Sequence, residues 1–133
     1  MAGYSGKPLA QKMGIKPGFR VHFRNVPESV VSELTFANEV EFTEPNTPDL
    51  DFIHACVTKL DELDPIYETA LKSLKPNGML WMSWPKKSSK VPTEVDENII
   101  RDIGLAAGLV DVKICAVDEI WSGLKFVRRL RDR

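Results

Sequence analysis

Leu50-Asp51-Phe52-Ile53-His54-Ala55-Cys56-Val57 is an almost continuous apolar run, interrupted only by Asp51 and His54. Such a run is typical of a strand that is covered on both faces. Apolar residues then repeat at helical spacing from Leu60 to Leu74, and Met79–Trp84 forms a second buried run. The order strand, helix, strand predicts a parallel α/β core in this half of the chain.

The sequence after Trp84 continues this pattern and then changes it. Residues 93–107 are expected to form a helix that begins at Thr93 or Asp96 and ends before Gly108. Two alternating segments follow, Val110–Val117 and Leu124–Arg129, with Trp121-Ser122-Gly123 in the turn between them. A strand that directly follows a strand predicts an antiparallel pair.

Shorter elements are expected before Leu50. They are an N-terminal arm that leads into a short helix with Ser5 as its cap, a strand at Phe19–Arg24, a helix at Ser29–Asn38 and a strand at Val40–Glu44. The sequence therefore predicts one domain over residues 1–133, of which residues 1–18 are the arm and the short helix. The expected fold class is α/β, a three-layer sandwich with a mostly parallel sheet and an antiparallel C-terminal edge pair.

Composition narrows the class of protein. The 133 residues include 18 Lys and Arg and 19 Asp and Glu, a balance that disfavours nucleic acid as the main partner. Two cysteines are too few for a disulfide scaffold. There is no apolar leader segment and no run of about 18 apolar residues, so we expect a cytoplasmic protein without a membrane partner.

Three segments resemble parts of the Rossmann-like S-adenosylmethionine-dependent methyltransferase fold. Asp51-Phe52-Ile53-His54-Ala55 resembles its fourth strand, and Leu74-Lys75-Pro76-Asn77-Gly78-Met79-Leu80 is similar to its entry into the fifth strand. The residues from Thr93 onward resemble its closing elements. The whole chain also resembles a small bacterial family recorded as a domain of unknown function, in residues 4–10, 84–86 and 117–123. That second resemblance implies no activity.

The cofactor half departs from the methyltransferase pattern. In that fold the first strand ends in an acidic, glycine-rich loop, which lets the backbone approach the cofactor. The equivalent stretch, Phe23–Ser29, has no glycine, and Pro27 removes a backbone donor. One strand–helix unit is also missing between Asn38 and Leu50. We therefore expect a degenerate site and no cofactor, with S-adenosylmethionine as the less favoured alternative.

The expected fold nominates one ligand site. Ligands bind beyond the carboxyl ends of parallel strands, where the strand order reverses. Glu44 there matches the acidic residue that holds the ribose in the family, Trp84 could offer a stacking face and Lys86 a charge for an anion. The alternative is that Trp84 belongs to the core and the lysines to a solvated loop. The candidate crevice residues are Asn25, Pro27, Glu28, Glu44, Thr58, Lys59, Trp84 and Lys86.

Other chemistry-bearing residues give weaker signals. His22 and His54 are expected on neighbouring strands, and Cys56 lies two residues after His54. Positions two apart on a strand are roughly 6–7 Å apart, and zinc needs three or four ligands, so we expect buried core side chains and no metal site. A basic C-terminal group could meet an acidic partner or nucleic acid, although a solvated chain end is favoured: Lys125, Arg128, Arg129, Arg131 and Arg133.

Two hypotheses of function follow. The sequence favours a methyltransferase-like domain without methyl-transfer activity that acts as a binding or interaction module, with a homodimer as one option. The alternative is a divergent small S-adenosylmethionine-dependent methyltransferase, or another nucleotide- or anion-binding enzyme, that uses the strand-end crevice. No catalytic residue, substrate or biological partner follows from the sequence.

Overall fold

The computed structural model describes residues 7–36 and 39–133. This part of the chain forms one six-stranded sheet and four α-helices. In chain order the elements are α1 (Leu9–Met13), β1 (Arg20–Arg24), α2 (Glu28–Thr35), β2 (Glu41–Phe42), β3 (Leu50–Cys56), α3 (Leu63–Ser73), β4 (Leu74–Pro85), α4 (Glu97–Ala107), β5 (Leu109–Ala116) and β6 (Trp121–Arg128). Single 3-10 turns lie at Leu60–Glu62, Lys87–Ser89 and Leu130–Asp132.

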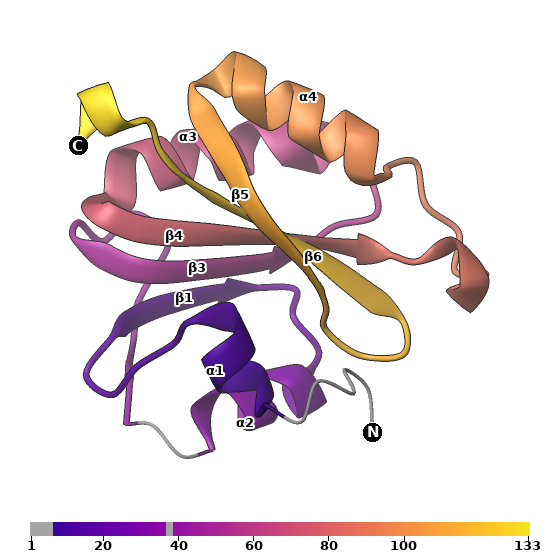
Figure 1. The fold of residues 1–133 in the computed structure, drawn as a ribbon, viewed down its shortest axis with the longest axis horizontal. Coiled ribbons are helices and arrows are strands. Elements are labelled where there is room, and N and C mark those ends of the chain that lie inside the picture. Colours follow the sequence, from indigo (N-terminus) through magenta and orange to yellow (C-terminus); the bar gives the residue numbers. More distant parts are fainter. Residues whose placement is uncertain (1–6, 37–38) are drawn as a thin grey trace.

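The sheet has the strand order β2-β1-β3-β4-β6-β5. The first four strands are parallel, and β6 runs antiparallel to both β4 and β5. Figure 1 shows α1 and α2 on one side of the sheet and α3 and α4 on the other. The expected three-layer α/β sandwich with an antiparallel C-terminal pair is therefore confirmed.

Local signals account for several element boundaries. The Asp96 carboxylate accepts a hydrogen bond from the Ile99 backbone N–H at 2.9 Å, so it caps α4. Gly108 ends that helix with φ at 111°, a left-handed conformation that glycine adopts without strain. Leu50–Cys56 is a strand, and six of its seven residues are buried. These features lie where the sequence placed them.

Three sequence expectations need adjustment. Strand β2 has only two residues, because only Glu41 and Phe42 pair with β1. Trp121-Ser122-Gly123 begins β6 and is not a turn, because these residues pair with Ser83–Pro85 of β4. Pro8 occupies the N-cap position of α1, and the expected cap Ser5 lies outside the described residues.

The connection from β2 to β3 is the place where the chain lacks a strand–helix unit. Only residues 43–49 join the two strands, and they contain no helix or strand. Parallel strands are usually joined by a crossover of about a dozen residues or more, generally a helix. The predicted absence of one strand–helix unit is confirmed, and it leaves β1 with a thinner cover on one face.

Two hydrophobic clusters lie on the opposite faces of the sheet. The cluster under α1 and α2 includes Trp81, whose indole N–H donates to the Met13 carbonyl oxygen at 2.9 Å. The cluster under α3 and α4 includes Tyr67, whose hydroxyl donates to the Ile100 carbonyl oxygen at 2.7 Å. Each buried polar tip therefore has a partner, and each ties a helix to the rest of the core.

Helix α4 approaches β6 closely at one glycine. A Cβ atom on Gly104 would collide with the ring of Phe126, which is fully buried. The Phe126 ring also packs edge-on against Tyr67, with ring centroids 5.4 Å apart. The ring therefore has little freedom to move away from the helix.

His54 is a polar side chain that is completely buried in the α1–α2 layer. Its Nε2 lies 2.8 Å from Ser83 Oγ and 4.0 Å from Cys56 Sγ, while Nδ1 has no hydrogen-bond partner among the described residues. Burial lowers the pKa of His54 from 6.5 to about 3. Burial, and next the charge of Asp118, raises the pKa of the Cys56 thiol to about 12. Both groups are neutral near pH 7, so neither a thiolate nor an imidazolium is available here.

We predict that Gly104→Ala destabilises the fold despite the higher helix propensity of alanine, which favours the variant by about 1 kcal/mol. Overpacking against Phe126 should outweigh this gain and leave a net loss of about 1–3 kcal/mol in urea denaturation. In a Phe126→Leu background, adding Gly104→Ala should cost much less stability than it does in the original chain. A Gly104→Ala variant as stable as the original chain would contradict the close packing.

We also predict that His54 makes stability depend on pH. The unfolded chain protonates His54 below about pH 6.5 and the folded chain only near pH 3, so the unfolded state binds more protons between these values. Stability should therefore fall as the pH decreases through this window. Relative to His54→Leu, the original chain should lose roughly 2–3 kcal/mol more between about pH 7 and pH 4.5. Carboxylates contribute equally to the pH dependence of both proteins. Unfolding free energies that change in parallel with pH would therefore refute the lowered pKa of His54.

Candidate functional site

The carboxyl ends of β1, β3 and β4 lie at one edge of the sheet, because these strands are parallel. Asn25 directly follows β1 and has φ at 54°, so it adopts the left-handed conformation that a glycine would otherwise supply. Pro27 is the N-cap of α2 and provides no side-chain cap, and Glu28 lies in the first turn. Glu44 is exposed, two residues after β2.

The loop after β3 is tied to other segments. The backbone N–H groups of Thr58 and Lys59 both donate to the Glu62 carboxylate, at 3.1 and 3.0 Å. The Thr58 carbonyl oxygen accepts from the Glu94 N–H at 2.7 Å and from the Thr93 hydroxyl at 3.2 Å. These two predicted crevice residues therefore have their backbone groups engaged within the protein.

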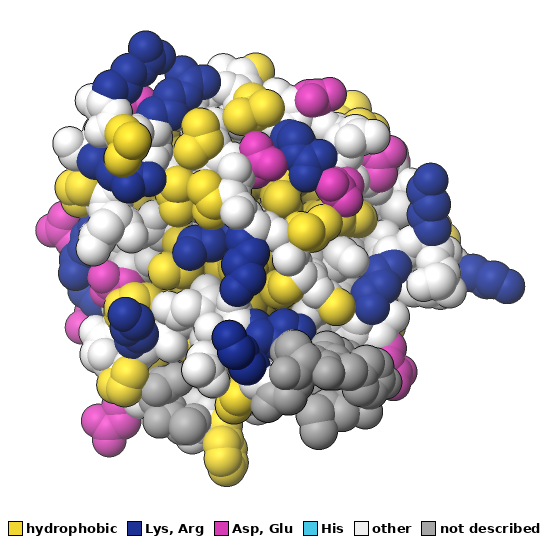
Figure 2. Space-filling view, viewed as in Figure 1, with side chains coloured by type: hydrophobic (Ala, Val, Ile, Leu, Met, Phe, Trp, Pro, Cys, Tyr) yellow, Lys and Arg dark blue, Asp and Glu magenta, His cyan; other side chains and the backbone are white. Residues whose placement is uncertain are grey.

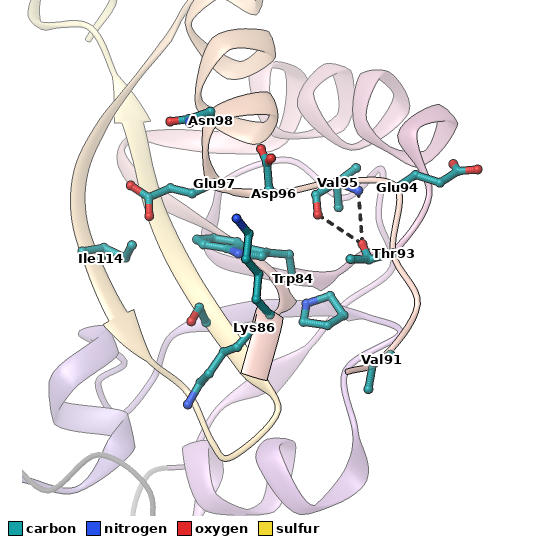
Figure 3. A pocket seen from close by; sticks show the side chains of 13 residues that line it. Trp84, Lys86, Val91, Thr93, Glu94, Val95, Asp96, Glu97, Asn98 and Ile114 are labelled. Atoms are coloured by element: carbon teal, nitrogen blue, oxygen red, sulfur yellow. Dashed lines mark hydrogen bonds between the residues drawn. The ribbon is translucent and has the colours of Figure 1, made fainter. Parts of the chain in front are cut away.

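A cavity of about 600 Å³ lies at the carboxyl end of β4. We call it the β4 pocket and define it by six of the residues that line it: Trp84, Lys86, Lys87, Thr93, Asp96 and Glu97. Figure 3 shows the Trp84 ring among these side chains, with Asp96 and Glu97 from the start of α4 on one side and Lys86 on the other. Ile114 of β5 also borders the space.

The carboxylates around the β4 pocket are bound within the protein. Asp96 caps α4, and Glu97 forms an ion pair with Arg101 at 2.7 Å. The Glu94 carboxylate accepts from the Leu60 N–H at 2.9 Å. By contrast, the side chains of Lys86 and Lys87 make no hydrogen bond or ion pair with any described residue. The charges left for a ligand are therefore positive.

Trp84 is only 6% exposed and belongs to the core cluster under α3 and α4. It therefore forms a wall of the β4 pocket and offers a ligand little of its ring face. The alternative in which Trp84 is a core aromatic thus describes its packing better than the stacking role does.

A second cavity of about 450 Å³ lies beside β1. We call it the β1 cleft and define it by its polar lining residues His22, Arg24, Asn25, Asn46 and Thr69. It shares no lining residue with the β4 pocket. Of the predicted crevice residues, Trp84 and Lys86 line the β4 pocket and Asn25 lines the β1 cleft, so the structure does not bring the predicted set together around one cavity.

Sequence reasoning did not nominate His22, Arg24, Asn46 or Thr69. The usable signal was the alternation in β1, where His22 and Arg24 share a face opposite Val21 and Phe23. Polar side chains on a strand face that should meet a covering helix indicate an incomplete cover. Nothing in the local sequence placed Asn46 or Thr69 beside that face.

Part of the basic C-terminal group has a structural role. Arg128 donates from Nη2 to the Leu71 and Leu74 carbonyl oxygens, both at 2.7 Å, and so caps the end of α3. Arg129 donates to the Leu105 carbonyl oxygen of α4 at 3.0 Å. Figure 2 shows Lys and Arg side chains scattered over the face drawn, between hydrophobic and uncharged atoms. This distribution is not a continuous basic surface.

The described residues form neither a metal-binding cluster nor a membrane-spanning helix. No group of three His, Cys, Asp or Glu side chains there converges as a metal site would require. In residues 7–36 and 39–133, no helix has the length and apolar character needed to cross a membrane.

Comparison with known proteins identifies the fold. No family model and no curated protein matches the sequence. Among solved structures, a candidate type 11 methyltransferase from Sulfolobus solfataricus is 16% identical, with 97% of this chain covering 94% of that one at a TM-score of 0.68. Magnesium protoporphyrin IX methyltransferase from Synechocystis, with bound S-adenosylmethionine, is 14% identical over 90% of this chain and 74% of that one, at a TM-score of 0.58.

Aeropyrum pernix fibrillarin, solved with natively bound S-adenosylmethionine, is 15% identical over 90% of this chain and 73% of that one, at a TM-score of 0.53. The expectation that no cofactor is bound is contradicted by these findings, because structures of this fold hold S-adenosylmethionine. At these identities the likeness concerns architecture: the chain has the fold of S-adenosylmethionine-dependent methyltransferases.

Proposed function

We propose that this protein is a ligand-binding domain built on the methyltransferase fold, which holds a small anionic molecule in the β4 pocket and does not itself transfer methyl groups. The observation that carries the proposal is the charge state of that pocket. Asp96 and Glu97 are committed to α4 and Arg101, whereas Lys86 and Lys87 have no partner among the described residues. A cavity with free ammonium groups favours an anion.

The position of the pocket adds support. It opens beyond the carboxyl end of β4, the edge at which open α/β sheets bind their ligands. The N-terminus of α4 also borders the pocket, but the Asp96 carboxylate already accepts from one N–H of its first turn. The lysines, and not the helix terminus, would therefore provide the attraction.

A second candidate is a small methyltransferase, and a specific observation favours it. Asn25 makes the left-handed turn after β1, and α2 then begins without a side-chain cap, so N–H groups of its first turn remain for an anionic group. Glu44 is exposed after β2 and could accept from ribose hydroxyls. Against it, Pro27 supplies no N–H. Bound S-adenosylmethionine would supply an activated methyl group, and Asn25 and Glu44 would hold it.

We predict that Lys86→Gln weakens binding of adenosine 5′-monophosphate, used as an anionic probe, by about 5-fold or more in calorimetric titration. Lys90→Gln is the matched control, because Lys90 lies in the same loop, is exposed and does not line the β4 pocket. The difference between the variants should shrink at high salt, which screens charge. Equal affinities for the two variants would overturn the proposed site.

A titration with S-adenosylmethionine tests the second candidate. If the chain is a methyltransferase, binding should be micromolar, and Glu44→Gln should weaken it about 10-fold, while Glu39→Gln at the opposite end of β2 should not. Formation of S-adenosylhomocysteine together with a methylated acceptor would contradict the proposal that the domain does not transfer methyl groups.

A further inference from the structure

The connection between β2 and β3, residues 43–49, crosses β1 as a short strap that contains no helix or strand. It lies on the α3 side of the sheet, because the Ser73 hydroxyl at the end of α3 donates to the Pro45 carbonyl oxygen at 3.1 Å. Arg20 of β1 donates to the Pro48 carbonyl oxygen at 2.7 Å. The strap is thus attached at both the helix and the strand that it passes.

Such a short strap covers less of β1 than a crossover helix would. The uncovered space is the β1 cleft. An adjoining recess of about 30 Å³ continues from it and is lined by the apolar side chains of Ile53, Ala55 and Ile66, together with His22 and Arg24. The recess has room only for a water-sized group, so a ligand would occupy the cleft itself, whose lining is mostly polar.

Arg24 is the unpaired charge of this cavity. It is half-buried and makes no hydrogen bond or ion pair with any described residue. Other arginines of the sheet and its helices do have partners: Arg20 pairs with Glu41, and Arg101 pairs with Glu97 and Asp111. No Asp or Glu is among the described residues that line the cleft or its recess. A half-buried guanidinium without a counter-charge favours an external anion.

His22 and Thr69 are oriented by the protein. His22 Nδ1 lies 3.0 Å from the Thr43 carbonyl oxygen, which only accepts, so Nδ1 carries the proton and Nε2 is the nitrogen available to a ligand. The Thr69 hydroxyl donates to the Pro65 carbonyl oxygen at 3.0 Å, so its lone pairs can accept. Asn46 is exposed at the mouth and adds an amide donor.

We propose that the β1 cleft binds a small organic anion, in addition to any ligand of the β4 pocket. Its carboxylate or phosphate group pairs with the guanidinium of Arg24, which presents two parallel N–H donors to such groups. Its apolar part lies in the cleft beside Pro45, which is half-buried and lines it. The cleft exists because the strand–helix unit is missing, so the same feature that shortens the fold creates this site.

The test is a titration of isotope-labelled protein with phenyl phosphate and, separately, with benzoate, followed by NMR. Signals of Arg24, Asn46 and Thr69 should shift, and Arg24→Gln should weaken binding about 10-fold or more. Arg24→Lys should give an intermediate loss, because an ammonium cannot pair in the two-pronged geometry. The probe that binds more tightly identifies phosphate or carboxylate as the preferred group.

Lys90→Gln is the control, because it removes one exposed positive charge that lines neither the β4 pocket nor the β1 cleft. It should leave the affinity for both probes unchanged. Shifts confined to Trp84 and Lys86, lost in Lys86→Gln, would overturn this inference while supporting the β4 pocket. Absence of binding by both probes at about 10 mM, or full affinity in a folded Arg24→Gln variant, would also overturn it.

Discussion

Burial of strand β4 is the constraint on which the rest of the structure depends. Residues Met79–Pro85 are all buried, and they pair with β3 on one side and β6 on the other. Both faces of this strand must be covered, which requires helices on both sides of the sheet. Trp81 holds α1 on one face through its hydrogen bond to Met13. On the other face, Trp84 packs in the cluster under α3 and α4, and it also lines the β4 pocket.

The short connection between β2 and β3 has consequences on two sides of β1. It leaves a two-residue β2, which offers little support for the ribose-binding position expected at Glu44. On the α3 side it replaces a crossover helix with the strap of residues 43–49, and the β1 cleft opens there. The short connection therefore weakens support for the ribose-binding position at Glu44 and also opens the β1 cleft.

Internal pairing decides which charges remain for ligands. Asp96 and Glu97, both at the mouth of the β4 pocket, are used to cap α4 and to pair with Arg101. Arg128 is used to cap α3. Lys86 and Arg24 have no such partner among the described residues. Each of these two side chains lines a different cavity, and in each case the remaining charge is positive.

The sequence by itself determined the α/β class, the buried strands β3 and β4, the missing unit and the start of α4 to within Thr93 or Asp96, because periodicity, cap residues and chain length can be read from the sequence. It also determined that His54 and Cys56 would be buried. Only the tertiary structure decided which side chains share a cavity. Asn46 and Thr69 meet Arg24 through long-range packing, and Thr58 and Lys59 leave the crevice because Glu62 and Glu94 engage their loop. Such contacts depend on hydrogen bonds between distant segments, which no sequence window contains.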